Sequence, residues 1–170
     1  YVRGVLSGDN NASNYTQFTM TGKIAASGNC NALWNYNDLD EPLKVRCGIS
    51  MFQGCTSLTT APELPATTLS NYCYGGMFSG CTSLTTAPEL PATTLTSYCY
   101  GGMFAGCTSL TTAPELTATT LVDNCYVYMF QDCSNLNYIK CLATDISAKN
   151  CTYGLLYRVS STGTFVKAAD

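Results

Sequence analysis

Histidine is absent from this 170-residue sequence, and charged residues make up only 11% of it. Without histidine, a serine or cysteine nucleophile lacks the base that most often activates it, so the sequence predicts a chain that is not an enzyme. The net charge of −3 and the lack of any long Lys/Arg run exclude the positive surface that binds nucleic acid or anionic lipid. We therefore expect no catalytic residues, no cofactor and no nucleic-acid partner.

Long apolar runs are missing as well. No segment approaches the roughly 18 uninterrupted apolar residues that cross a bilayer, so we expect no membrane insertion. The sequence opens on Tyr1-Val2-Arg3, without a starting methionine or a charged-then-apolar signal pattern, and we expect a mature or excised fragment rather than a complete cytosolic chain. A hydrophobic content of 46% is sufficient for the core of one domain.

Internal repetition, by contrast, is abundant, and it has a constant period of 26. A glycine, replaced once by aspartate, marks the same position in each copy: Gly54, Gly80, Gly106 and Asp132. Residues 51–76 and 77–102 differ at only three positions. Because one unit cannot bury its own apolar face, the period predicts stacked units that share a core, a solenoid. We expect repeats over 47–142 between caps at 1–46 and 143–170, all in one structural domain.

Each unit combines two apolar patterns. Leu58, Ala61 and Leu64 predict a short extended segment that pairs in parallel with its equivalents in the next units. The residues that follow recur every four positions, at Leu69 and Cys73, which predicts one face of a short helical turn. In the caps, alternation over 18–24 predicts strands of a hairpin that closes the sheet edge, and 163–166 suggests the same at the other end.

The same ordered landmarks appear in every unit, and in the first copy they are Phe52, Gly54, Cys55, Leu58, Ala61 and Pro65. Their order resembles Phe-x-Gly-Cys-x-x-Leu-x-x-Ile-x-Ile-Pro, the motif of the BspA-like leucine-rich repeats of bacterial, Bacteroides-type surface proteins. The resemblance covers residues 43–142. The longer period, the Ala for Ile and the inserted Pro62-Glu63 depart from that motif. Proline donates no backbone hydrogen bond, so we expect Pro62 and its equivalents to interrupt the strand ladder as a bulge.

This resemblance implies an α/β leucine-rich-repeat solenoid, with short parallel β-strands on one face, short helical turns on the other and β-rich caps. It also implies a bacterial cell-surface or extracellular protein that acts in adhesion or protein binding. Its partner would be a protein or glycan on a host or neighbouring cell surface. The near-identical copies favour an alternative function, that of a structural spacer or of the tip module of a phage tail fibre or surface appendage.

Cysteine is plentiful, with eleven residues, but no two are spaced as C-x-x-C, so we expect no metal site. In stacked units nine of them fall into two columns in which each acts as a small buried hydrophobe. The columns are Cys55, Cys81, Cys107 and Cys133, and Cys47, Cys73, Cys99, Cys125 and Cys151. We expect buried free thiols, with disulfides between neighbouring copies as the alternative.

The candidate binding residues repeat from unit to unit. Three glutamates are the only charged residues between positions 51 and 122, and the charges of the two flanks cancel, so these three account for the whole net charge. A strand would turn one threonine of each neighbouring Thr-Thr pair outward. The candidates on the strand side are Thr60, Thr86, Thr112, Glu63, Glu89 and Glu115. The alternative is a solvated row that keeps a Thr-rich sheet from pairing with its own copies.

Tyrosines crowd the turn region on the opposite side of each unit. Exposed tyrosines are common binding anchors, whereas packing at the rim of the core is the alternative. The candidates here are Tyr74, Tyr100 and Tyr126.

Overall fold

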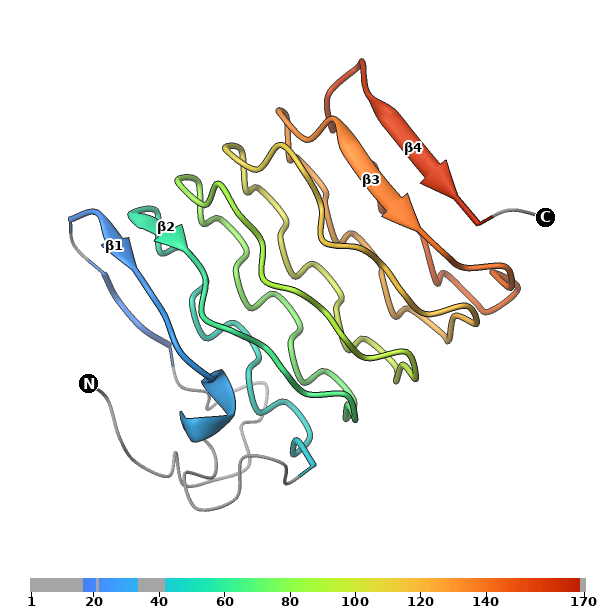
Figure 1. Cartoon of the computed structure of the whole chain (residues 1–170), viewed down its shortest axis with the longest axis horizontal. Coiled ribbons are helices and arrows are strands. Elements are labelled where there is room, and N and C mark those ends of the chain that lie inside the picture. The colour runs from blue at the N-terminus through green and yellow to red at the C-terminus, as the bar shows by residue number, and fades with distance from the viewer. Residues whose placement is uncertain (1–16, 21, 34–41, 169–170) are drawn as a thin grey trace.

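The computed structural model describes residues 17–20, 22–33 and 42–168, so the cap expected at 1–46 lies partly outside the described residues. Most of the described chain is neither helix nor strand (Figure 1). Its regular elements are β1 (Ile24–Ala25), the 3-10 helix η1 (Cys30–Leu33), β2 (Leu58–Thr60), β3 (Tyr138–Cys141) and β4 (Thr164–Lys167).

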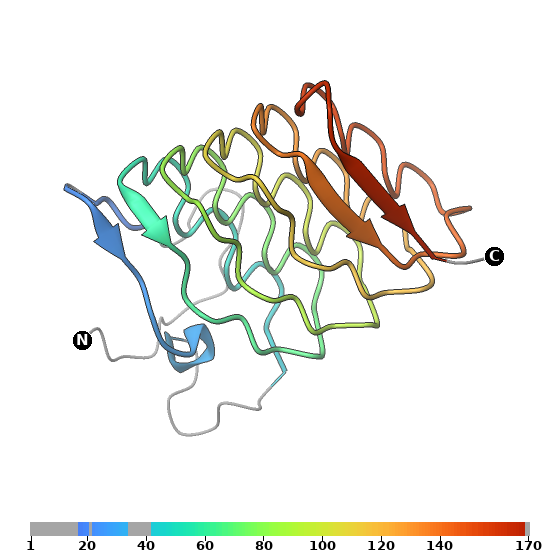
Figure 2. The same cartoon turned by 45° about the horizontal axis from the view of Figure 1, so that its top comes forward.

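The strands pair in parallel. β1 pairs with β2 and β3 pairs with β4, and isolated parallel bridges such as Thr60–Thr86 and Thr68–Thr94 join equivalent positions of neighbouring copies. The two views of the chain show successive windings side by side between β1 at one end and β4 at the other (Figures 1 and 2). The predicted parallel register between neighbouring copies is confirmed at these bridges.

The strand ladder is interrupted where the prolines lie. No backbone hydrogen bond joins the two segments that lie between the Thr60–Thr86 and Thr68–Thr94 bridges, both of which are fully described. This is expected because the prolines in these segments donate no backbone hydrogen bond. Nor does a backbone hydrogen bond join residues 85–95 to 111–121, which are also described throughout. The parallel pairing predicted between the second and third copies is therefore absent here, where we expected only an interruption at the prolines. On this side the central units depend on side-chain packing.

On the opposite side the chain forms what we call the turn ribbon, residues 44–55, 70–81, 96–107, 122–133 and 148–158. Its backbone N–H groups donate alternately to a carbonyl of the same segment and to a carbonyl of the next copy. In the second segment, Cys73 and Gly75 donate to carbonyls three residues back, whereas Tyr72 and Tyr74 donate to Ser97 and Cys99 in the next copy. Each ribbon segment is therefore fastened to the next by a hydrogen bond at nearly every second residue.

The helical turns predicted for this side are wrong. In every ribbon segment one residue in four has a positive φ, as at Tyr72 (60°), Gly76 (62°) and Gly80 (75°). A right-handed helix cannot include such residues, because its backbone needs a negative φ throughout. The four-residue apolar period that indicated a helix arises instead from consecutive turns that bury two neighbouring residues out of every four.

The core consists of equivalent side chains stacked from unit to unit. Leu58, Leu84 and Leu110 are fully buried below the strand side. Beneath the ribbon the phenylalanine rings of neighbouring copies stack with centroids 5.4–5.7 Å apart. This phenylalanine column consists of Phe52, Phe78, Phe104 and Phe130. Aromatic stacking at this spacing adds to the burial of the rings themselves.

Neither end carries the predicted hairpin in the described residues. β1 and β4 each add one more parallel row to their neighbours, β2 and β3. At the amino-terminal end, Phe18 stacks on Phe52 at 5.2 Å and donates its N–H to the carbonyl of Met51. Phe18 thus continues the phenylalanine column and covers its first member.

Candidate functional site

The strand side presents exposed threonines in rows. Both threonines of the pairs at 85–86, 93–94, 111–112 and 119–120 are exposed, which corrects the expectation that one of each pair points inward. Each pair lies between two inward residues three positions apart, so the backbone follows a three-residue period rather than the two-residue period of a strand. This local conformation doubles the density of hydroxyl groups on the surface.

The predicted residues Thr60, Thr86 and Thr112 are all exposed, and three glutamates lie three residues after them. We call this set the Thr/Glu face: Thr60, Thr86, Thr112, Glu63, Glu89 and Glu115. Glu63 and Glu89 are exposed, and their carboxylates have no ion-pair partner among the described residues. The two carboxylates and the threonine hydroxyls offer a partner the same polar groups in successive units.

Glu115 differs from the other two glutamates. Its Oε2 lies 2.9 Å from Nζ of Lys140, and both side chains are about one-third exposed. The sequence did not predict this ion pair, because a fixed period of 26 aligns Glu115 with Cys141. The observed bridges are Thr112–Tyr138 and Leu116–Cys141, so the fourth copy is one residue shorter here and Lys140 falls at the glutamate position.

The missing residue in the fourth copy is the proline. Without it, the backbone at 138–141 can pair continuously, and β3 forms there with β4 beside it. The carbonyls of Tyr138 and Lys140 also accept hydrogen bonds from Ala113 and Leu116. The loss of one proline therefore places both a longer strand and a positive charge at the end of the Thr/Glu face.

Tyr74, Tyr100 and Tyr126 do not form a binding surface. Their exposed fractions are 0%, 1% and 1%, and they stack on one another inside the core. Each follows an inward cysteine and is the second buried residue of a ribbon turn. A helix with the cysteine facing inward would instead turn the next residue, the tyrosine, away from the core. Burial also raises their pKa well above the ordinary value.

Other tyrosines lie on the outer side of the turn ribbon. Tyr72 stacks on Tyr98 with ring centroids 4.6 Å apart, and the Arg46 guanidinium lies 5.1 Å from the Tyr72 ring. Both tyrosines have a positive φ and are partly exposed. Their side chains cover the ribbon turns. The outer surface of the turn ribbon is therefore aromatic here, whereas the surface of the strand side is rich in hydroxyl groups.

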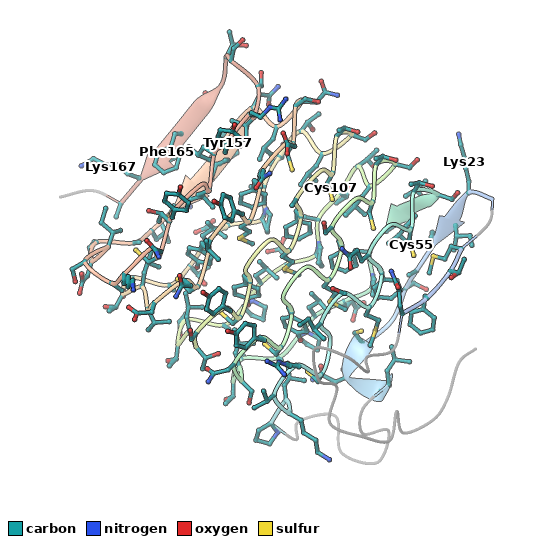
Figure 3. All side chains as sticks on the ribbon, turned by 180° about the vertical axis from the view of Figure 1, so that it is seen from behind. Lys23, Cys55, Cys107, Tyr157, Phe165 and Lys167 are labelled. Carbon is teal, nitrogen blue, oxygen red and sulfur yellow. The ribbon has the colours of Figure 1, made fainter. Side chains whose placement is uncertain are left out.

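All eleven cysteines are buried and none is in a disulfide, which confirms the predicted burial. The thiols of Cys81, Cys107 and Cys133 donate to phenylalanine carbonyls of the preceding copy, at 3.0–3.1 Å. Burial raises the pKa of Cys30 and Cys47 from 9.0 to about 12. Figure 3 shows Cys55 and Cys107 within the interior of the stack. This environment strongly disfavours the reactive thiolate.

Within the described residues, no group of three or more His, Cys, Asp or Glu side chains is arranged to hold a metal ion. The helix found in this part of the chain is too short to span a membrane. Comparison of the chain with protein-family models, with curated proteins and with solved structures found no match.

Proposed function

We propose that this chain is a BspA-like leucine-rich-repeat solenoid that serves as a non-catalytic adhesion or protein-binding module on a bacterial cell surface. The observation that carries the proposal is the Thr/Glu face, where the equivalent threonine is exposed in three consecutive units and the glutamate that follows it is exposed in the first two. Catalytic sites need different groups brought together at one point, whereas this surface repeats one small set of groups along its length. Repetition suits binding to an extended or multivalent partner.

The chemistry of the Thr/Glu face fits a protein or glycan partner. Threonine hydroxyls both donate and accept hydrogen bonds, and carboxylates accept them from hydroxyl or amino groups. A partner that contacts one unit lies within reach of the next two, so weak contacts add through effective concentration. Glu63 and Glu89 supply the charge for this recognition, because Lys140 neutralises Glu115.

The test compares two glutamate variants. Binding of the chain to immobilised mucin and extracellular-matrix preparations is measured over a salt series. We expect Glu63→Gln with Glu89→Gln to weaken binding and to flatten its salt dependence, because both free carboxylates are lost. The control Glu115→Gln removes a carboxylate that is already paired, so it should change binding less. If the double variant bound as the parent chain does at every salt concentration, the glutamates would only solvate the sheet.

A structural spacer or appendage tip is the second candidate. It is favoured by the near-identity of residues 51–76 and 77–102, which differ at only three positions. Near-identical units set a length without needing a particular surface. The two functions separate by mapping. Adhesion predicts that substitutions on the Thr/Glu face abolish binding, whereas a spacer predicts that only substitutions at the two ends have an effect.

A further inference from the structure

The fourth copy changes both rows of the Thr/Glu face. The Thr112–Tyr138 bridge places Tyr138 in the row of threonines, and the Glu115–Lys140 ion pair places Lys140 in the row of glutamates. Strand β3 carries both residues and lies between the third copy and β4 (Figure 1). The face is therefore continued by an aromatic ring and an ammonium group, where the earlier copies offer a hydroxyl and a carboxylate.

Tyr138 projects from the surface of β3. It is 38% exposed and Lys140 is partly exposed, whereas Ile139 between them is buried. Tyr138 and Lys140 thus point to the same side of the strand. In its row the tyrosine lies between Thr112 and Thr164, whose exposed side chains are much shorter. The ring therefore stands above its neighbours in the row and is accessible to a partner.

Four side chains from neighbouring units come together here. We call them the Tyr/Lys corner: Thr112, Glu115, Tyr138 and Lys140. Oε2 of Glu115 lies 2.9 Å from Nζ of Lys140. Paired strands lie about 4.8 Å apart, and residues two apart on one strand lie about 7 Å apart. The corner is therefore about as wide as a single sugar ring, and it offers an aromatic ring, a hydroxyl, a carboxylate and an ammonium group.

The groups of the Tyr/Lys corner match the two kinds of surface on a sugar ring. One face of a pyranose consists of C–H groups, which pack against the face of an aromatic ring. Its rim carries neighbouring hydroxyl groups, each of which can donate to a carboxylate or accept from an ammonium group. The Glu115–Lys140 pair supplies this acceptor and donor side by side. Because the ion pair already restrains both side chains, a bound sugar costs them little further conformational entropy.

Charge separates neutral glycans from acidic ones. Glu115 and Lys140 neutralise each other, whereas Glu63 and Glu89 make the rest of the Thr/Glu face negative. Carboxylates repel a sialylated or sulfated glycan, but they accept hydrogen bonds from the hydroxyl groups of a neutral one. The charge of the face thus favours a neutral, hydroxyl-rich glycan.

The exposed side chains of the two rows fit a glycan better than a protein. The structure describes both rows throughout, from Thr60 to Thr164 and from Glu63 to Val166, and Tyr138 is their one large hydrophobic residue that is more than one-third exposed. Tight protein contacts bury a central cluster of apolar side chains. A single aromatic ring among hydroxyl and carboxylate groups does not form such a cluster, but it is sufficient to stack on a sugar.

We infer that the Tyr/Lys corner is a sugar-binding subsite, and that the partner of the Thr/Glu face is a neutral glycan. This inference rests on the proposed binding function of that face and names its partner class. One sugar residue stacks on Tyr138 and hydrogen-bonds to the Glu115–Lys140 pair, and the glycan continues along the rows toward Glu63. Further sugar residues meet the threonine and glutamate groups of the earlier units, so weak contacts add.

Oxidation of the glycan tests the partner class. Periodate cleaves sugars between neighbouring hydroxyl groups and leaves most of the polypeptide intact. Binding of the parent chain to immobilised gastric mucin should fall more than about tenfold after periodate and borohydride treatment, whereas removal of sialic acid and sulfate should not weaken it.

The outcomes distinguish this inference from the proposed function. If binding to periodate-treated mucin is undiminished, the partner surface is protein and the inference is wrong, while the adhesion function stands. If the parent chain binds matrix proteins but neither mucin nor the neutral polysaccharide mannan, again only the inference is wrong. If it binds none of these preparations, the proposed function fails as well.

A set of variants tests the Tyr/Lys corner itself. Tyr138→Thr gives the fourth copy the residue of the earlier copies, and it should weaken mucin binding by about tenfold or more because the stacking ring is lost. Tyr138→Phe keeps the ring and should weaken binding by less than about threefold. The matched control Tyr153→Thr removes a tyrosine that is 59% exposed on the turn ribbon, and it should leave binding unchanged. Equal effects of Tyr138→Thr and the control would overturn the inference.

The lysine separates a sugar from a cationic partner. Lys140→Met removes the ammonium donor and should weaken the binding of a neutral glycan. A basic protein would instead bind this variant more tightly, because Glu115 regains an unpaired charge. Tighter binding by Lys140→Met would therefore overturn the inference. So would parental binding by Tyr138→Thr alongside weaker binding by the Glu63→Gln and Glu89→Gln double variant, because the face would then bind without the corner.

Discussion

Alkaline pH should destabilise this protein because its thiols are buried in the protonated form. Burial raises the pKa of Cys30 and Cys47 from 9.0 to about 12, and it raises the pKa of several stacked thiols in the same direction. In the unfolded chain these groups lose their protons near the ordinary value. Above that pH the unfolded state binds fewer protons than the folded state, so stability falls as pH rises.

The magnitude follows from the pKa difference. For one thiol that titrates at 9.0 when unfolded and near 12 when folded, raising the pH to about 10 stabilises the unfolded chain by about 1.4 kcal/mol. Cys30 and Cys47 together contribute about 3 kcal/mol, against a total of about 5–15 kcal/mol for a typical domain. The contribution is fully present below about pH 9 and is lost progressively toward about pH 12.

Urea unfolding at constant ionic strength and in excess reductant, at several pH values between about 7.5 and 10.5, measures this loss. The free energy of unfolding should be level up to about pH 8 and then fall with increasing slope. A Cys47→Ala variant starts from lower stability but should lose less of it over the same range, because it has one thiol fewer to ionise. An unchanged free energy of unfolding up to about pH 10.5 would refute the reasoning.

Three further results are expected. Leu84→Ala, in the middle of the stack and fully buried, should lower the free energy of unfolding by about 2–5 kcal/mol in the same assay; a loss under about 1 kcal/mol would mean that this position is not core. Gly163→Ala should cost about 1–3 kcal/mol, because the added Cβ would press on the Asn137 backbone, while Thr164→Ala in an exposed neighbour should cost less. Iodoacetamide should label most thiols only after denaturation, and rapid labelling of the native chain would contradict their burial.

The sequence was most informative where positions repeat. The repeat period predicted the parallel register at Thr60–Thr86, the buried cysteine columns and the exposure of Glu63 and Glu89. These features depend only on equivalent residues lying beside one another in neighbouring units. Any fold that stacks the units produces them, whatever the local backbone conformation.

Features that depend on local backbone geometry were not predictable in this way. A four-residue apolar period occurs both in a helix and in consecutive turns, and only the positive φ at positions such as Tyr72 separates the two. The wrong choice then placed Tyr74 on the surface instead of in the core. The Glu115–Lys140 ion pair was missed because a single-residue deletion in the fourth copy shifts the alignment.

The constant offset between bonded positions in the turn ribbon has a genetic consequence. Each N–H that donates to the next unit bonds to the carbonyl 25 residues later, one residue less than the repeat period. In units 51–76 and 77–102 the residues at equivalent positions of these contacts are nearly the same. Unequal recombination between the two corresponding stretches of the gene would add or remove one complete unit at once. Because the two units differ at only three positions, nearly all contacts in the longer or shorter product would match contacts in the parent, so chain length can change in whole units with little need for compensating substitutions.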